Sequence, residues 1–211
     1  MPLRNRVDPA GAIHAVADRG EFYGNRGCLH DESGRLVRHA QVKRWLICLT
    51  AFKGRRRLLL QPGQYTELFF LDEVTGLAAG HRPCFECRRD AAKSYATRFA
   101  SVHGLTDPKV DAIDAILDTE RRIPHDDASR RTSIAALADN PDGVMVRQGD
   151  RFFALKGQRL LHWSFGGYGA PIPLAALGGA PIFRVTPPTT MAILADGYAP
   201  VFHSGIAAGS A

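Results

Sequence analysis

Hydrophobic and polar positions change their spacing several times along this chain of 211 residues. Residues 1–45 are rich in glycine, arginine, histidine and aspartate, which is typical of loops joined by short strands. Three apolar runs follow, Trp45–Phe52, Arg57–Leu60 and Glu67–Leu71, and each is short enough to be a buried strand. The polar segment 53–56 would turn the chain between the first two, so the pattern predicts a small sheet here.

Helical spacing appears in the middle of the chain. Asp72 precedes a short helix predicted over Glu73–Ala79, which Gly80 would end. We expect Asp90 to cap a second helix, whose apolar face comprises Ala91, Tyr95, Phe99 and Val102. A third helix is predicted over residues 110–122, between two prolines.

From about Asp139 the pattern favours strands again. Turn signals at Asp142-Gly143 and Gln148–Asp150 surround two apolar segments, Val144–Val146 and Arg151–Leu155. A brief helix is expected over Thr190–Ala195. Together these elements predict the α+β class, with a zinc-stapled module and N-terminal extension over residues 1–103, a helical segment over 104–140 and a β-rich part over 141–211, all of which could form one domain.

Cysteine spacing carries the clearest chemistry. Cys84 and Cys87 stand two residues apart after Pro83, and both sulfurs of such a turn can reach one tetrahedral zinc ion. Cys28 and Cys48 would complete a site of four cysteines, and His30 is an alternative ligand to Cys28. A paired cysteine motif can also be a redox centre, but the βαβ pattern expected around one is absent from the sequence.

The segment around this pair resembles a known module. Leu68–Asp72 and Gly76–Arg88, with the sequence GLAAGHRPCFECR, are similar to the metal-binding domain of Ada-type DNA-repair proteins, and the likeness extends weakly back to Trp45–Cys48. The resemblance implies a zinc ion held by four cysteines in a small DNA-binding α/β module. It also implies that Cys48 takes the place of the thiolate that accepts a methyl group. The family has a cysteine four residues later, where this chain has Phe52.

A second arrangement uses the same cysteine pair. His30 and Glu32 form a His-x-Glu half-motif, which with Cys84 and Cys87 would match the zinc-dependent deaminases, Glu32 moving protons for attack of water on a base. That arrangement leaves Cys28 and Cys48 unused, and the sequence after Glu32 is typical of a turn and not of a helix start.

The net charge of +6 favours an anionic partner, DNA or RNA first. The basic residues expected at a nucleic-acid interface are Lys53, Arg55, Arg56, Arg57, Arg82, Arg88 and Arg89. An alternative function is an enzyme that binds a small molecule in a C-terminal pocket lined by aromatic residues such as Trp163, Tyr168 and Tyr198, with zinc only as a staple. Neither a membrane-length apolar run nor a secretory signal is present, so the expected location is the cytoplasm.

Overall fold

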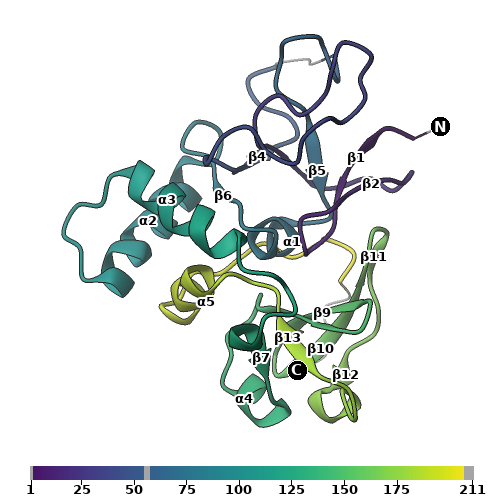
Figure 1. The fold of residues 1–211 in the computed structure, drawn as a ribbon. Coiled ribbons are helices and arrows are strands. Elements are labelled where there is room, and N and C mark those ends of the chain that lie inside the picture. Colours follow the sequence, from purple (N-terminus) through teal and green to yellow (C-terminus); the bar gives the residue numbers. More distant parts are fainter. Residues whose placement is uncertain (1, 55–57, 207–211) are drawn as a thin grey trace.

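The computed structural model describes residues 2–54 and 58–206, which form two sheets and five α-helices. Figure 1 shows the first sheet at the top, the second at the bottom, and α1 between them. The fold is therefore of the α+β class. The strands of the first sheet are β1 (Arg4–Val7), β2 (Ile13–Ala15), β3 (Phe22–Asn25), β4 (Leu46–Leu49), β5 (Leu68–Phe70) and β6 (Arg82–Pro83).

The first sheet is mixed, with the order β2-β1-β5-β3-β4-β6. β1 lies parallel to β5 and β4 lies parallel to β6, while the other pairs are antiparallel. The predicted strands at 45–52 and 67–71 are confirmed as the shorter β4 and β5. The predicted strand at 57–60 is wrong over Leu58–Leu60, which the structure describes: Leu59 and Leu60 form a turn, and Leu60 has a φ of 54°.

Helix α1 (Glu73–Ala78) follows β5 directly, and its capping is as predicted. The Asp72 carboxylate accepts the backbone N–H of Thr75 at 2.8 Å, and Gly80 takes a φ of 83° just after the helix. All six residues of α1 are buried because both sheets pack around it. Gly76 is needed for this close packing, since a Cβ there would lie 2.8 Å from Cδ1 of Ile47.

Three of the other helices, α2 (Arg89–His103), α3 (Val110–Arg121) and α5 (Pro188–Ala195), pack together beside α1, whereas α4 (Ile134–Ala138) lies next to the second sheet. The predicted helix at 110–122 and the C-terminal helix are confirmed. The expectation that Asp90 caps α2 is wrong: the cap position is Arg88, and Asp90 lies in the first turn. The sequence analysis missed α4, which Ser133 caps through the N–H of Ala136.

The second sheet is antiparallel throughout, with the order β11-β10-β9-β8-β13-β7 and β12 paired to β10. Its strands are β7 (Arg131–Thr132), β8 (Met145–Gln148), β9 (Arg151–Lys156), β10 (Arg159–Ser164), β11 (Gly167–Tyr168), β12 (Ile172–Pro173) and β13 (Ile182–Arg184). The strands predicted before and after Gln148–Asp150 are confirmed as β8 and β9. One hydrophobic core joins residues of both sheets, from Val7 and Ile47 to Val146 and Phe153. Within the described residues, no helix combines the length and apolar character that crossing a bilayer demands.

Candidate metal centre

Three cysteines meet at the edge of the first sheet. Cys48 lies on β4, and Cys84 and Cys87 follow the neighbouring strand β6. The parallel pairing of Ile47 with Pro83, extended by the Cys84 N–H donated to the Ile47 carbonyl at 2.9 Å, brings the first two cysteines together. The three Sγ atoms all lie within 4.8 Å of one another. A tetrahedral ion bound by thiolates at about 2.3 Å requires sulfurs at this separation.

The turn after β6 positions its two sulfurs with backbone hydrogen bonds. The N–H of Glu86 donates to Sγ of Cys84 at 3.4 Å, and the N–H of Leu49 donates to Sγ of Cys87 at 3.4 Å. The Arg88 N–H donates to the Cys84 carbonyl at 3.0 Å, which closes the turn and leads into α2. Such N–H donors stabilise negative charge on sulfur, which is the form that binds a metal.

The three thiols also perturb one another. A hydrogen bond from Cys48, together with those from backbone N–H groups, lowers the pKa of Cys84 to about 5. Burial acts in the opposite direction but is the weaker effect. The pKa of Cys87 is lowered too, first by Cys48. The pKa of Cys48 is raised, because its thiol donates to the other two sulfurs and is buried beside them. The arrangement therefore holds negative charge on the cysteine pair, where a cation would replace the shared proton.

No fourth cysteine, histidine or carboxylate joins the three sulfurs among the described residues. The residues outside that description are methionine, arginine, alanine, glycine and serine, and none is of these types. The chemistry of the three donors fits a thiophilic ion such as zinc. Zinc ordinarily takes four ligands, of which these three cysteines would supply three.

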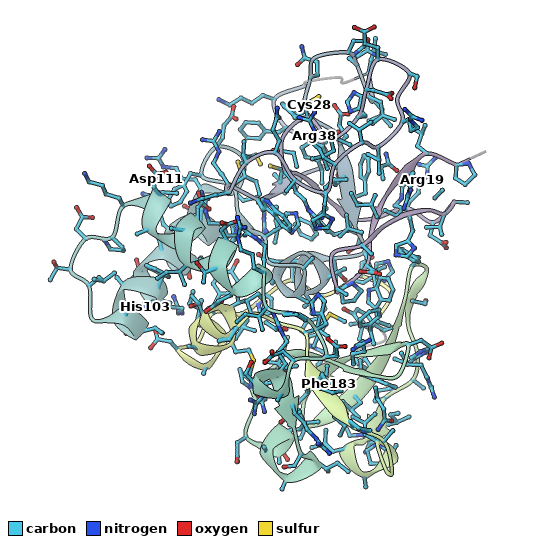
Figure 2. All side chains as sticks on the ribbon, in the orientation of Figure 1. Arg19, Cys28, Arg38, His103, Asp111 and Phe183 are labelled. Carbon is cyan, nitrogen blue, oxygen red and sulfur yellow. The ribbon has the colours of Figure 1, made fainter. Side chains whose placement is uncertain are left out.

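Cys28 and His30, the expected fourth ligands, lie elsewhere. Cys28 is labelled in Figure 2 among the loops at the top of the molecule, and its thiol donates to the His30 carbonyl at 3.5 Å. The His30 ring is buried between the Thr66 hydroxyl at 2.6 Å and the Gln61 carbonyl at 3.2 Å. The structure thus brings together three of the four predicted cysteines. The deaminase arrangement loses its histidine ligand, and Glu32 is exposed.

The predicted basic surface is only partly formed. Arg82 is buried, and its guanidinium makes two bonds of 2.8 Å to the Asp114 carboxylate. Arg88 pairs with Glu73 at 2.7 Å. Both were expected to contact nucleic acid, but Arg82 joins β6 to α3 and Arg88 joins the start of α2 to α1, because a buried guanidinium needs a carboxylate partner. Lys53 and Arg89 are exposed as expected, while Arg55, Arg56 and Arg57 lie outside the described residues.

The aromatic residues of the C-terminal part pack against α1. The Trp163 indole N–H donates to the Thr75 hydroxyl at 3.0 Å, the Tyr168 hydroxyl to Asp72 at 2.9 Å, and the Tyr198 hydroxyl to Glu73 at 2.6 Å. The same carboxylates accept backbone N–H groups from residues 201 and 203. These side chains therefore join the second sheet to α1, a role that their sequence pattern did not reveal.

The sequence analysis also missed a cavity beside the cysteines. Tyr23 on β3 pairs with Cys48 on β4 and with Phe69 on β5, so the three residues form one row across the face of the sheet opposite the core. A cavity of about 290 Å³ lies on this face and is lined by Tyr23, Leu49, Thr50, Phe52, Leu59, Glu67 and Phe69. The sequence signal that could have revealed this outer face is the alternation of inward-facing and outward-facing residues in β3 and β5.

Comparison with known proteins adds no relative. No family model matches the chain, and neither a curated protein nor a solved structure matches it. The resemblance to Ada-type domains thus rests on the residues of the chain alone.

Proposed function

We propose that Cys48, Cys84 and Cys87 bind one zinc ion, and that the face of the first sheet beside it binds nucleic acid. The observation that carries the proposal is the convergence of three sulfurs within 4.8 Å from two strands far apart in sequence. In a reduced compartment, such a group is held together at lower energetic cost by a metal than by three neighbouring thiols. Resemblance of residues 68–88 to the Ada-type zinc module supports the same ion.

The three sulfurs are not equivalent. Cys84 and Cys87 each accept a backbone N–H, whereas Cys48 accepts none among the described residues. Hydrogen bonds to a metal-bound thiolate withdraw charge from it and reduce its nucleophilicity, so Cys48 would be the most reactive of the three. In the Ada-type family that the chain resembles, the cysteine at this position accepts a methyl group from DNA. We therefore propose that Cys48 is the reactive thiolate of this chain.

Nucleic-acid binding is supported by the row of side chains that leads to the metal centre. The Arg6 guanidinium lies 4.8 Å from the centre of the Phe69 ring, and Phe69 packs edge-on against Tyr23. Aromatic rings and arginines arranged along one face stack on bases and contact phosphates. The cavity of about 290 Å³ on this face is near the lower end of the size of small-ligand pockets, which suits a single base.

Metal content per chain tests the first part of the proposal. We expect about one zinc ion per chain in the wild type and in Cys28→Ser, measured by mass spectrometry of the metal, and loss of zinc in the Ser variants of Cys48, Cys84 and Cys87. Cys28→Ser is the matched control, because it removes a thiol outside the group. Absence of zinc from the wild type, or loss of zinc from the Cys28 variant, would contradict the three-cysteine site.

Binding of a fluorescent single-stranded oligonucleotide tests the second part. We expect affinity that falls steeply with salt, and a further loss of about 5- to 100-fold in Phe69→Ala, the range for removing one stacking platform. Arg151→Ala, which removes an exposed charge from the second sheet, is the control and should bind almost normally. Zinc-loaded protein that fails to bind at low salt would exclude the nucleic-acid function but leave the metal centre in place.

A further inference from the structure

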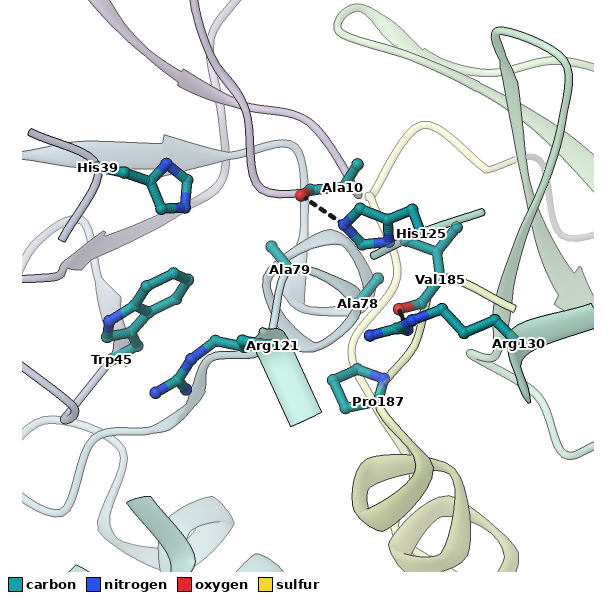
Figure 3. A pocket seen from close by; sticks show the side chains of 10 residues that line it. All are labelled: Ala10, His39, Trp45, Ala78, Ala79, Arg121, His125, Arg130, Val185 and Pro187. Carbon is teal, nitrogen blue, oxygen red and sulfur yellow. Dashed lines mark hydrogen bonds between the residues drawn. The ribbon is translucent and has the colours of Figure 1, made fainter. Parts of the chain in front are cut away.

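A second cavity lies on the other side of α1, where the two halves of the chain meet. Figure 3 shows His39, Trp45 and Arg121 on one side of it and His125 and Arg130 on the other, with Ala78 and Ala79 of α1 between them. We call this space the junction cavity. The volume open to the centre of a water molecule is about 30 Å³. This is room for roughly two water molecules or one small oxyanion.

Positive charge gathers around the junction cavity. Arg121 and Arg130 line it, and Arg26 lies behind Trp45, with no exposed surface. The guanidinium carbons of Arg26 and Arg121 lie 4.0 Å and 4.2 Å from the centre of the Trp45 ring, so two cations share one indole. Burial, and then the charge of Arg121, lower the pKa of Arg26 to about 9. Buried charges of one sign are costly unless a counter-charge is supplied.

The chain supplies little counter-charge of its own. Among the described residues, no carboxylate lies within ion-pair distance of Arg26 or Arg130, and Arg121 reaches Asp118 only at 3.5 Å. Their guanidinium groups donate mainly to backbone carbonyls, such as Gly11, Gly80 and Val185.

The nearby acids are engaged by other groups. Asp8 accepts from His14 at 2.8 Å, Asp118 from Arg122 at 2.9 Å, and Glu120 from the Thr189 hydroxyl at 2.7 Å.

Several donors around the cavity lack a partner. They are buried N–H groups without a hydrogen bond, namely Nε of Arg121 and Nε of Arg130, which line the cavity, and Nη2 of Arg26, which stacks on Trp45. A buried donor without an acceptor costs free energy, so three such atoms in and beside one cavity are a reason to expect an acceptor there. The acceptor must be small and negatively charged, and it must offer several oxygens.

We propose that the junction cavity binds a phosphate group, held by Arg121 and Arg130, with the charge of Arg26 next to Trp45. The anion supplies the missing counter-charge, and it joins α3 and the segment before the second sheet to the loops of the first sheet. Binding therefore stabilises the contact between the two halves of the chain. The site is separate from the metal centre, and it does not depend on zinc or on nucleic acid.

Titration calorimetry and thermal unfolding with inorganic phosphate test the proposal at pH 7 and constant ionic strength, with chloride as the reference salt. We expect saturable binding of phosphate and a rise in the unfolding temperature that chloride does not produce. His39 is exposed at the mouth of the cavity and lies 3.1 Å from Nη1 of Arg26 through its Nε2, and both Glu and Gln keep an acceptor for that guanidinium. His39→Glu should weaken phosphate binding by about tenfold or more through charge repulsion, while the uncharged His39→Gln should change it little.

Arg151→Gln, an exposed arginine that does not line the cavity, should bind phosphate as the wild type does. The absence of saturable binding to the wild type would overturn the proposal. So would an equal response in His39→Glu and His39→Gln, because binding would then reflect the general positive charge of the surface. A nucleoside 5′-monophosphate tests the source of the group: tighter binding than inorganic phosphate indicates a terminal phosphate of a larger molecule, and weaker binding indicates the free ion.

Discussion

The two sheets of this protein differ in how far apart in sequence their neighbouring strands lie. In the second sheet, β8, β9 and β10 follow one another through tight turns, so its central pairings are local, and among the described strands only β13 returns to β8 and β7 from more than thirty residues away. In the first sheet, β1 pairs with β5 and β4 with β6, each across more than thirty residues of chain. The candidate metal centre lies in the first sheet, at the non-local pairing of β4 with β6. The position of the three cysteines therefore depends on a few contacts between segments far apart in sequence. Substitutions at such contacts test the difference between the two sheets.

The largest effect is expected where α3 holds the edge strand β6. Asp114→Ala leaves the Arg82 guanidinium buried without its carboxylate, and it should lower the free energy of unfolding by about 3–5 kcal/mol in urea denaturation. Asp118→Ala on the same helix is the control and should cost about 1 kcal/mol, because its partner Arg122 is exposed and the more distant Arg121 also donates to two backbone carbonyls.

The double variant Arg82→Met with Asp114→Leu sharpens this test. We expect it to be more stable than Asp114→Ala alone, since both charges are then removed together. If Asp114→Ala costs no more than Asp118→Ala, the first sheet does not depend on this long-range contact, and the contrast between the sheets fails.

The next effect concerns close packing within the first sheet. A Cβ on Gly24 of β3 would lie 2.3 Å from the Leu46 carbonyl oxygen and 2.5 Å from the Phe70 ring. We therefore expect Gly24→Ala to cost at least about 2 kcal/mol, measured by thermal or urea unfolding, because backbone cannot move aside as a side chain can. Gly178, between β12 and β13, is the matched control: the nearest atom to a Cβ there is 3.9 Å away, and Gly178→Ala should be nearly neutral. Equal effects of the two changes would show that the first sheet is no more tightly constrained than the second.

A smaller effect is expected on acidification, and it should act mainly on the half that contains the first sheet. Burial, followed by the charges of Arg26 and Arg121, lowers the pKa of His39 to about 4 and that of His81 well below its ordinary value. These histidines stay neutral in the folded chain while the unfolded chain takes up protons near pH 6.5. Stability should therefore be full above about pH 6.5 and fall as the pH drops toward 4.

The expected loss between pH 7 and pH 5 is about 2 kcal/mol, read from urea midpoints at the two pH values. Most of it comes from the buried His81, and less from His39, whose exposed ring is screened by solvent. His39→Gln should show a shallower dependence, because one of the two groups no longer titrates. A midpoint that stays constant or rises toward pH 5 would show that the histidines are not held neutral by the fold.

Much of the local structure follows from the sequence, because it depends on residues close together in the chain. Asp72 caps α1, Gly80 ends the segment after it, and the turn between β8 and β9 falls where Gln148–Asp150 predict it. The Cys84–Cys87 turn is of the same kind: two ligands in one short segment are recognisable before anything else is known. The sequence thus determines that a closely spaced cysteine pair exists and that an α+β chain surrounds it.

The tertiary structure decided everything that depends on contacts between distant segments. It selects Cys48 as the third member of the candidate metal centre and leaves Cys28 outside, because β4 lies beside β6 whereas Cys28 is tied to its own loop. It also turns Arg82 inward, since the carboxylate of Asp114 on α3 is available only after folding. Composition records how many cysteines and arginines a chain has; which of them become partners is settled by strand pairing and burial, whose free energies come from residues far apart in sequence.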